Sequence, residues 1–196
     1  MLLGVQRGVL GGTFDPPHLA HLVAAEAAYH QLDLDVVSFV PAGAPWQKAG
    51  AGVTAPAHRL AMTALAIAGT EYFVVDDREV QRGGWTYTID TIETYPADDA
   101  VTLIVGADAA AGVPGWHRAA ELMECARFAV VPRPGASRRA VEDALAEARF
   151  EWLDMPEMAI SSTALRSRTS AGLSLRFLVP RAVEDYIEER GLYREE

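Results

Sequence analysis

The sequence predicts an α/β fold: a single domain with a central parallel sheet, helices on both faces and a small C-terminal helical segment. The first observation behind this prediction is alternation, because short apolar runs of strand length take turns with stretches that are apolar at helical spacing. The second is length, because 196 residues suffice for one well-buried domain and are too few for two ordinary ones. We therefore expect residues 1–196 to form one domain, with 159–196 as its C-terminal helical part.

Six runs have the length and the apolar, β-branched or aromatic content of strands. They are residues 8–10, 36–41, 72–75, 101–105, 128–131 and 152–153. Helical patterns begin at residue 19, cover 57–66 with Gly69 as the stop, and cover 141–149. A last helix over 181–190 is closed by Gly191. Strands that alternate with helices imply right-handed crossovers and therefore a parallel sheet covered on both faces.

The bulk composition limits the function classes. The formal net charge of −10 disfavours general nucleic-acid binding, which needs a surplus of lysine and arginine against phosphates. Cys125, the single cysteine, rules out an internal disulfide, and its apolar helical surroundings predict a core thiol. No apolar stretch approaches about 20 residues and no basic segment precedes a long apolar run, so we expect no signal peptide, no membrane span and a cytoplasmic protein. A homo-oligomer is compatible with the sequence, which leaves the oligomeric state open.

A phosphate-binding loop is predicted where the first strand meets the first helix. Gly11 and Gly12 let backbone N–H groups approach an anion closely, and Thr13 and Phe14 continue the same loop. The helix that follows offers unpaired N–H groups and partial positive charge at its first turn. A glycine pair alone is usually only a turn, and its spacing here fits neither a dinucleotide fingerprint nor a P-loop.

His18 and His21 are three residues apart and therefore share one face of the first helical turn. Imidazoles there can donate hydrogen bonds to phosphate oxygens, and a nearby anion favours their charged form. A lone histidine on a helix is usually solvated or a satisfied core residue, but the composite GGTFDPPHLAHL is far more specific than its parts. It resembles the (H/T)xGH signature of the nucleotidyltransferase superfamily, in which the histidines hold a nucleotide triphosphate while its α-phosphorus is attacked. Ala20 stands where that signature usually has glycine.

The loop 42–55 is long for a connector and carries Lys48, the only lysine of the chain. In an acidic protein this lysine is about as well explained by phosphate binding as by an ordinary solvated charge. The pattern Pro-x-x-x-Pro-x-x-Lys after the second strand is similar to the loop that holds the acceptor phosphate in nicotinate mononucleotide adenylyltransferases. The helix that follows starts with His58 and Arg59, which we expect to face solvent without a functional role.

Two further segments suggest a site for a flat, acidic acceptor. Thr86 and Thr88 can be ordinary helix caps, but Tyr-Thr-x-Asp-Thr resembles the segment that presents donors to the pyridine carboxylate in the same adenylyltransferases, which implies Thr86, Tyr87 and Thr88. Trp116 is a residue type that more often belongs to a core. In a loop before a helix start, however, its indole can stack on a heterocycle such as nicotinate, and Trp116 with His117 matches the family pattern.

Polar residues also follow the fourth and fifth strands, at the sheet edge where ligands of parallel sheets bind. Gly106 and Asp108 come directly after the fourth strand, and Asp108 either caps a short helix or meets ribose hydroxyls. Arg133 follows the fifth strand and either faces the adenine of ATP or flanks a turn, with the turn slightly favoured.

A second signature lies near the C-terminus. The run Ile-Ser-Ser-Thr opens a helix by capping, and Ser162, Thr163 and Arg166 fall in its first turns. The run resembles the superfamily motif ISSTxxR, whose hydroxyls, amides and arginine grip the β- and γ-phosphates of ATP.

The order of these motifs over nearly the full length resembles bacterial nicotinate-nucleotide adenylyltransferases. The resemblance implies a Rossmann-like domain that transfers the adenylyl group of ATP to nicotinate mononucleotide in NAD synthesis. It implies that His18, His21 and Arg166 hold the ATP phosphates and the departing pyrophosphate, and that Lys48 holds the attacking phosphate. Mg²⁺ is then carried mainly by the phosphates rather than by a cluster of protein carboxylates.

Alternatives stay open within and outside this class. The acceptor can be nicotinamide mononucleotide, phosphopantetheine or a polyol phosphate, although phosphopantetheine enzymes lack the Tyr-Thr-x-Asp-Thr and Trp-His segments. A catalytically silent nucleotide sensor is another option, for which Ala20 is the one indication. A redox protein of the Rossmann type is disfavoured by the missing glycine fingerprint.

Overall fold

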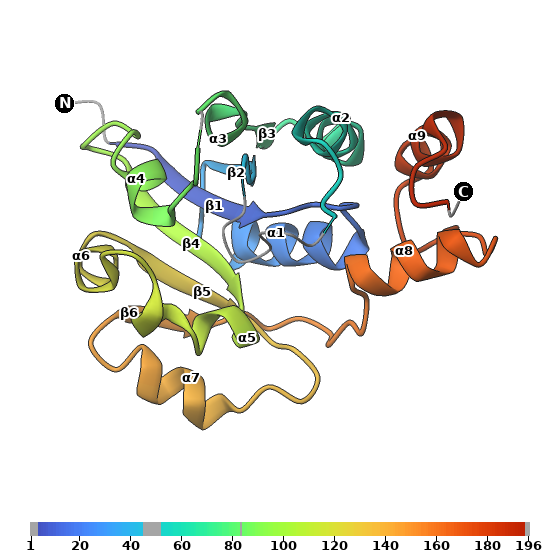
Figure 1. Cartoon of the computed structure of the whole chain (residues 1–196). Coiled ribbons are helices and arrows are strands. Elements are labelled where there is room, and N and C mark those ends of the chain that lie inside the picture. The colour runs from blue at the N-terminus through green and yellow to red at the C-terminus, as the bar shows by residue number, and fades with distance from the viewer. Residues whose placement is uncertain (1–3, 45–51, 83, 195–196) are drawn as a thin grey trace.

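A six-stranded parallel sheet forms the centre of the computed structural model, which describes residues 4–44, 52–82 and 84–194. Its strands are β1 (Gln6–Gly12), β2 (Val36–Pro41), β3 (Phe73–Val75), β4 (Ala100–Gly106), β5 (Arg127–Val131) and β6 (Arg149–Trp152). The strands are ordered β3-β2-β1-β4-β5-β6 (Figure 1), and each neighbouring pair is parallel. This is the order of doubly wound Rossmann-like folds, so the predicted fold class is confirmed.

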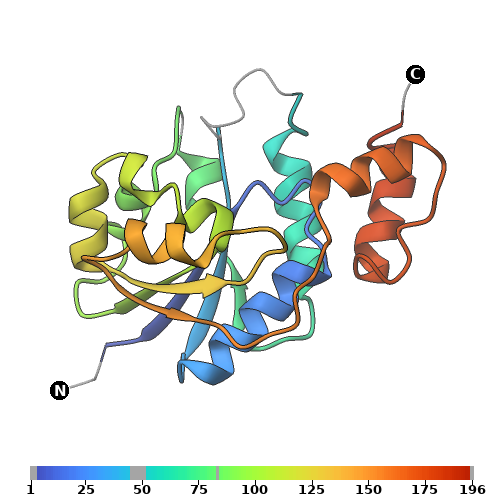
Figure 2. The ribbon, with the colours of Figure 1, turned by 90° about the horizontal axis from the view of Figure 1, so that it is seen from below.

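The helices cover both faces of the sheet (Figure 2). In chain order they are α1 (Leu19–Gln31), α2 (Pro56–Ile67), α3 (Arg78–Gln81), α4 (Thr88–Ile92), α5 (Ala107–Ala110), α6 (Ala119–Cys125), α7 (Arg138–Ala144), α8 (Ser162–Ser170) and α9 (Arg181–Arg190). A short 3-10 helix, Val113–Gly115, precedes α6. Within the described part of the chain, no helix has the length and apolar character needed to cross a membrane.

Two hydrophobic cores lie on the two faces of the sheet. Residues of α1, α2, α8 and α9 pack into one core, and residues of α4 to α7 pack into the other. Neighbouring strand residues alternate between the two cores: Leu10 and Phe39 belong to the first, whereas Val9 and Val40 belong to the second. Both faces of the sheet are therefore buried, which explains why its strands read as nearly continuous apolar runs.

The winding of the chain reverses between β1 and β4. From β1 the chain leaves through α1 on one face, and from β4 it leaves through α5 and α6 on the other, while the two strands pair side by side. A crevice outside the carboxyl ends of the strands is expected at such a point. Strand β1 ends there at Gly12 and strand β4 at Gly106, so the predicted site residues around these two glycines lie next to each other.

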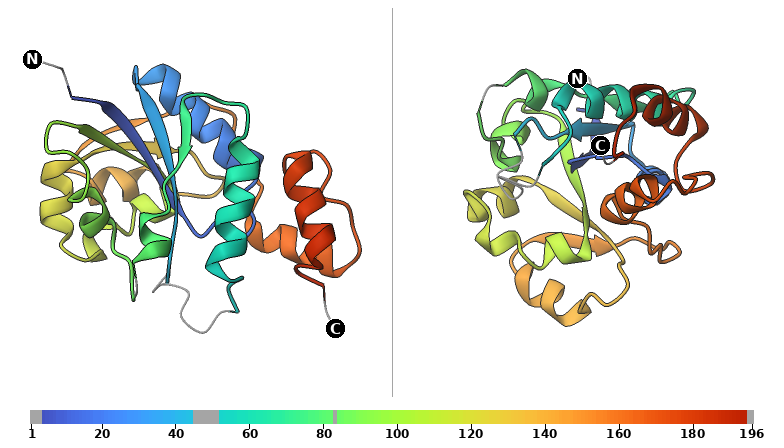
Figure 3. Two further views of the ribbon diagram at one scale, coloured as in Figure 1. Left: turned by 90° about the horizontal axis from the view of Figure 1, so that it is seen from above. Right: turned by 45° about the vertical axis from the view of Figure 1, so that its right-hand side comes forward.

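The C-terminal helices α8 and α9 lie at one end of the molecule, beside α1 and α2 (Figures 1 and 3). Leu165 of α8 and Val183 and Ile187 of α9 are buried in the core that α1 and α2 share. Helix α9 ends, as predicted, at Gly191, which adopts a left-handed conformation with φ of 61°. The C-terminal segment is thus held against the end of the sheet where β1 leads into α1.

Two expectations about individual elements are wrong. The helix predicted over 141–149 is α7, which starts earlier, at a cap in which the Ser137 hydroxyl accepts from the Ala140 N–H group (3.2 Å). It ends at Ala144 because the chain then turns to pair β6 with β5, and sheet pairing overrides the helical charge pattern. Cys125 is exposed rather than buried, because α6 directs Leu122 into the core and ends at the cysteine.

Candidate active site

A cavity of about 380 Å³ opens at the carboxyl ends of β1, β2 and β4. Most of the residues predicted to bind a nucleotide or an acceptor line it: Gly11, Gly12, Thr13, His21, Thr86, Tyr87, Thr88, Gly106, Asp108, Trp116, His117 and Arg133. The segments that carry them are far apart in sequence and meet only in the folded chain. This cavity therefore brings together the predicted nucleotide-binding residues and the predicted acceptor-binding residues.

The loop after β1 forms one wall of the cavity. A side chain added at Gly11 would meet nothing within 4 Å, so the backbone there faces open space that a ligand can enter. Phe14, in contrast, turns its ring away from the cavity: it is buried, adopts a positive φ of 50° and packs its ring at 5.0 Å from that of His21. The side chain of Phe14 thus packs against His21, and only the backbone of Phe14 belongs to the surface of the loop.

His18 and His21 stack on each other, with 3.7 Å between ring centroids and 18° between ring planes. The backbone N–H group of His18 donates to Nδ1 of His21 (3.2 Å), and a neutral imidazole that accepts at Nδ1 carries its proton on Nε2. His21 lines the cavity, whereas His18 is only 2% exposed. The two imidazoles therefore occupy different positions: His21 forms part of the wall, and His18 lies beneath it.

Burial and the positive charge of Arg133 lower the pKa of His18 to about 4. The His18 imidazole is accordingly neutral near pH 7, and the expectation that a nearby anion favours its charged form stays a prediction. The side chains of His18 and His21 form a capping box at the start of α1, in which each accepts from the backbone N–H group of the other. Within the described residues, Nε of Arg133 is buried without a hydrogen-bond partner, which leaves a donor in this site for a ligand to satisfy.

A second, smaller cavity of about 30 Å³ adjoins the first. Its apolar wall includes Met155 and Met158, which no sequence motif singled out. His21, Gly106 and Arg133 line both cavities, so the two spaces meet at these residues. The site therefore consists of a large compartment and a small side compartment, which meet at His21, Gly106 and Arg133.

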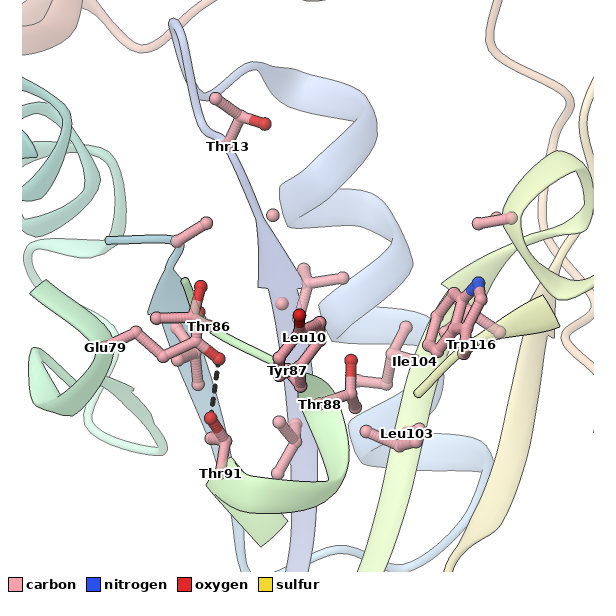
Figure 4. A pocket seen from close by; sticks show the side chains of 18 of the residues that line it. Leu10, Thr13, Glu79, Thr86, Tyr87, Thr88, Thr91, Leu103, Ile104 and Trp116 are labelled. Atoms are coloured by element: carbon pink, nitrogen blue, oxygen red, sulfur yellow. Dashed lines mark hydrogen bonds between the residues drawn. The ribbon is translucent and has the colours of Figure 1, made fainter. Parts of the chain in front are cut away.

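The segment 86–91 forms the opposite end of the large cavity. Glu79 of α3 accepts a hydrogen bond from the Thr91 hydroxyl (2.7 Å), and both side chains lie in the cavity wall near Thr86 (Figure 4). Burial raises the pKa of Glu79 above its ordinary value. Neither Thr86 nor Thr88 caps a helix through its side chain, because the cap position of α4 is Tyr87, where no side-chain cap bond forms.

Trp116 lies across the large cavity from Glu79 and Thr86 (Figure 4). The ring of His117 stacks on that of Tyr87 with centroids 4.3 Å apart, which joins the two predicted acceptor-binding segments. Arg118 strengthens this connection, because its Nη2 atom lies 2.6 Å from Oε1 of Glu93 just after α4. The Trp116 loop is thereby anchored to the segment that carries the threonines.

Gly106 leaves space where β4 ends. A Cβ atom added to it would lie 2.6 Å from Oδ1 of Asp108 and 3.3 Å from Nε of Arg133, so both side chains would have to shift. Asp108 is exposed and does not cap α5 through its side chain, because the cap position is Gly106 itself. The glycine thus allows the Asp108 carboxylate and the Arg133 guanidinium to converge at the junction of the two cavities.

The C-terminal motif packs directly onto the loop after β1. Ser161 caps α8 by accepting from the Ala164 N–H group (3.2 Å), as the capping pattern predicts. The hydroxyl of Ser162 donates to the carbonyl of Pro16 (2.9 Å), and Nη1 of Arg166 donates to the carbonyl of Asp15 (2.9 Å).

Thr163 is exposed in the same turn of α8. The early and late motifs therefore meet, although Ser162, Thr163 and Arg166 stand beside the large cavity rather than in its wall. Lys48 lies outside the described residues.

Comparison with known proteins assigns the chain to a family. The cytidylyltransferase-like family model matches residues 9–168. A relative from Clavibacter michiganensis subsp. michiganensis, named a probable nicotinate-nucleotide adenylyltransferase, is 44% identical over 191 residues, which cover 95% of this chain and 93% of the relative. A relative of the same name from Desulfitobacterium hafniense strain Y51 is 40% identical over 197 residues, covering 95% of each chain. The chain belongs to the nicotinate-nucleotide adenylyltransferase family.

Solved structures of this family share the fold. The Plasmodium falciparum nicotinic acid mononucleotide adenylyltransferase complexed with NaAD superimposes with a TM-score of 0.83, covering 96% of this chain and 97% of that one at 18% identity. The same enzyme complexed with APC gives a TM-score of 0.80. The chain is therefore a nucleotidyltransferase enzyme with the architecture of the adenylyltransferases.

Arg59 is a residue of this adenylyltransferase that the sequence did not reveal. It was expected to face solvent, yet it is 0% exposed and donates to the carbonyls of Thr13 (2.8 Å), Gly43 (3.0 Å) and Thr54 (2.8 Å). His58 is half-buried and bonds to the Tyr186 hydroxyl (2.9 Å). Both expectations fail because α9 and the β1 loop cover the start of α2, and no local pattern in 56–67 records those distant partners.

Proposed function

We propose that this chain transfers the adenylyl group of ATP to nicotinate mononucleotide, forming nicotinate adenine dinucleotide and pyrophosphate. The observation that carries the proposal is that one cavity brings together the loop after β1 and the segment 86–88 with Trp116, because a reaction that joins two nucleotides must hold both of them at one place. The names of the relatives and the NaAD complex of the Plasmodium falciparum enzyme support this choice of acceptor.

The ATP phosphates are proposed to bind along the loop after β1 and the first turn of α1. Backbone N–H groups of Gly12 and Thr13 and the positive end of a 13-residue helix suit an anion there. His18 and His21 lie in that first turn, and Arg166 reaches the same loop from α8. Phosphate bound near His18 raises the pKa of that imidazole again, so that binding and protonation support each other.

The β- and γ-phosphates are proposed to extend toward the start of α8. Ser162 and Thr163 stand there with Arg166, and in the absence of ligand the Ser162 hydroxyl and one Arg166 nitrogen bond to loop carbonyls. Those bonds orient both side chains toward the loop before ATP arrives. The departing pyrophosphate then remains beside Arg166, whose charge stabilises it.

The adenosine of ATP is proposed to lie beside Arg133, against the methionines that line the smaller cavity. The apolar methionines Met155 and Met158 suit the flat face of an adenine, and the Asp108 carboxylate suits ribose hydroxyls. Of the two roles considered for Arg133, its buried, unpaired Nε atom supports the ligand-facing one, while its Nη1 atom donates to the Ile160 carbonyl (3.4 Å).

Nicotinate mononucleotide is proposed to occupy the end of the large cavity formed by Thr86, Tyr87, Thr88, Trp116 and His117. The indole of Trp116 can stack on the pyridine, and hydroxyl and N–H donors of the 86–88 segment can receive its carboxylate. The acceptor phosphate then points toward His21, and Lys48 is proposed to hold it.

The proposed chemistry needs no protein base and no covalent intermediate. The 5′-phosphate of the acceptor is already an anion and attacks the α-phosphorus of ATP in line with the departing pyrophosphate. The Nε2–H group of His21 is placed to stabilise the charge that builds up on the α-phosphate oxygens. Catalysis therefore rests on positioning and on fixed donors.

Mg²⁺ is proposed to enter with ATP as part of the substrate. In the described ranges, no group of three or more histidine, cysteine, aspartate or glutamate side chains could hold a metal ion. Triphosphate oxygens are preferred ligands of Mg²⁺, so the metal can bind to ATP without a dedicated cluster of protein carboxylates.

The proposed reactants are small molecules, and ATP and a mononucleotide are substrates that the cytoplasm supplies. We infer no nucleic-acid partner, because a chain with a net charge of −10 lacks the basic surface that phosphate backbones require. A homo-oligomer is compatible with this function and is not needed to complete the two compartments described above.

Pyrophosphate release tests the proposal. Purified protein is incubated with MgATP and either nicotinate mononucleotide or nicotinamide mononucleotide, with 4′-phosphopantetheine as a third acceptor. We expect release with nicotinate mononucleotide at a clearly higher kcat/KM than with the others, and a dinucleotide product of matching amount. ATP binding without pyrophosphate release for any acceptor would contradict the proposal and favour a nucleotide sensor.

A further inference from the structure

Asp15 connects the phosphate loop to three distant segments of the chain. Its Oδ1 atom accepts from the Tyr193 hydroxyl (2.6 Å), and its Oδ2 atom accepts from the Thr54 N–H group (3.1 Å). Its backbone carbonyl accepts from Arg166 (2.9 Å), and the residue is only 2% exposed. Asp15 therefore accepts hydrogen bonds from a residue before α2, a residue in α8 and a residue after α9.

Arg59 completes this arrangement from the other side of the loop. Its fully buried guanidinium donates to the carbonyl of Thr13, two residues before Asp15, and to that of Thr54, whose N–H group Asp15 accepts. Burial lowers the pKa of Arg59, and the charge of Asp15 opposes that shift. The backbone from Thr13 to Asp15 is thus fixed between a buried cation and a buried anion.

Tyr193 supplies the contact that comes from farthest along the sequence. It follows Gly191 after the end of α9, and its hydroxyl is 178 positions away from Asp15 in sequence. Burial and the bond to Asp15 raise the pKa of Tyr193, so the phenol keeps its proton and donates it to the carboxylate. Such a bond to a charged acceptor is among the stronger hydrogen bonds in proteins.

We propose that Tyr193 is a positioning residue for ATP: by holding the Asp15 carboxylate, it fixes the loop from Thr13 to His18 that receives the phosphates. This inference rests on the adenylyl transfer proposed above. A displacement of Asp15 moves Thr13 on one side and His18 on the other, and misplacement of donors by about 1 Å costs about 100-fold in rate in sensitive cases. Tyr193 thereby influences the position of the phosphate-binding loop without contacting the ligand.

Tyr186 provides a matched control on the same part of the chain. Its hydroxyl bonds to Nδ1 of His58 (2.9 Å), so it joins α9 to α2 just as Tyr193 joins the chain after α9 to the loop. Neither the hydroxyl nor its partner belongs to the phosphate loop. If the substitutions act only by loosening the packing of α9, Tyr193→Phe and Tyr186→Phe should therefore have the same effect on activity.

The test compares Tyr193→Phe with Tyr186→Phe. For Tyr193→Phe we expect kcat/KM for ATP to fall about tenfold, the effect of losing one hydrogen bond to a charged group, with KM for nicotinate mononucleotide within about twofold of wild type. For Tyr186→Phe we expect both values to stay near wild type. Unfolding in urea is measured for both variants, so that a loss of stability is compared directly with the loss of ATP use.

A double-variant cycle shows whether Tyr193 acts through Asp15. If it does, Tyr193→Phe adds little to the effect of Asp15→Asn on kcat/KM for ATP, because the contact is already impaired. Additive effects in the cycle, or equal ATP parameters for Tyr193→Phe and Tyr186→Phe, would overturn the inference.

Direct ATP binding, measured by calorimetry on the same proteins, separates this proposal from the proposed reaction. A wild type that binds ATP but transfers nothing would contradict the reaction alone. A Tyr193→Phe variant that binds ATP as tightly as wild type and turns over at the same rate would contradict the positioning role alone.

Discussion

The imidazole of His18 lies under that of His21, with the two ring planes 18° apart and the ring centroids separated by 3.7 Å. Because one ring lies on the other, the two histidines have different roles. His21 lines both cavities, whereas His18 is buried beside Arg133 and holds a pKa of about 4. We interpret His18 as the support that fixes the ring orientation of His21 in the absence of a nucleotide, and as a phosphate ligand once one is bound.

The lowered pKa of His18 predicts a pH dependence of stability. In the unfolded chain His18 has an ordinary pKa of 6.5, so below that pH the unfolded state takes up a proton that the folded state refuses down to about pH 4. The stabilising contribution is therefore complete above pH 6.5 and is lost as the pH falls toward 4. Between about pH 7.5 and about pH 5 we expect His18 to reduce the free energy of unfolding by about 2 kcal/mol.

Urea unfolding of wild type and His18→Gln across this pH range measures the effect. The variant has no group that titrates at this position, so its free energy of unfolding should decline less steeply toward low pH than that of wild type. Parallel curves for the two proteins would show that His18 is not responsible.

His21 is predicted to carry a large part of the rate. We expect His21→Ala to lower kcat by about 10²–10³, the usual loss when one fixed donor is removed from developing charge. The control is His30→Ala, because His30 is exposed at the end of α1 and its Nε2 atom lies 3.0 Å from Oε1 of Glu26. Steady-state pyrophosphate release measures both, and full activity in His21→Ala would remove His21 from the mechanism.

Trp116 is predicted to act on the acceptor alone. We expect Trp116→Ala to raise KM for nicotinate mononucleotide by about three- to tenfold, the worth of one aromatic stacking contact, while the affinity for ATP changes little. Trp85→Ala is the matched control, because Trp85 is 58% exposed and is not part of the cavity wall. Separate titrations of each substrate check the result, and an equal loss for both substrates would refute the stacking contact.

Local patterns in the sequence predicted the fold because the forces that determine it are local. The strand runs are β-branched and apolar, Gly191 stops α9 with a positive φ, and Ser161 caps α8. The helix predicted over 141–149 failed where a non-local force prevailed, since the pairing of β6 with β5 ends α7 at Ala144. Element type thus follows from composition, but element ends depend on partners that lie far along the chain.

Part of the site was predictable for the same reason. Motifs that line the cavity, such as the loop around Gly11 and the segment 86–88, keep their residue types next to one another in sequence. The groups that fix those motifs do not: Arg59 bonds to Thr13, and Tyr193 to Asp15, across the fold. No spacing rule connects such pairs, because each one looks locally like an ordinary first-turn or terminal residue.

Arg59 is predicted to stabilise the fold as well as the loop. Replacement by methionine leaves the half-buried carbonyls of Thr13, Gly43 and Thr54 without their donors and the buried Asp15 without its counter-charge. Each unpaired buried group costs about 1–3 kcal/mol, so we expect Arg59→Met to reduce the free energy of unfolding by at least about 3 kcal/mol. Urea unfolding at neutral pH measures this loss.

Two further variants make the measurement decisive. Arg168 is exposed, and among the described residues it donates through Nε and Nη2 only to the Ser174 carbonyl, so Arg168→Met should change stability by less than about 0.5 kcal/mol. Arg59→Lys keeps a positive charge but cannot reach three carbonyls in different directions, and it should fall between wild type and Arg59→Met. If Arg59→Lys is as stable as wild type, charge alone holds the loop and the three directed hydrogen bonds are dispensable. If Arg59→Met and Arg168→Met lose equal stability, the buried guanidinium contributes no more than a surface contact, and the loop after β1 must be held by Asp15 and its partners alone.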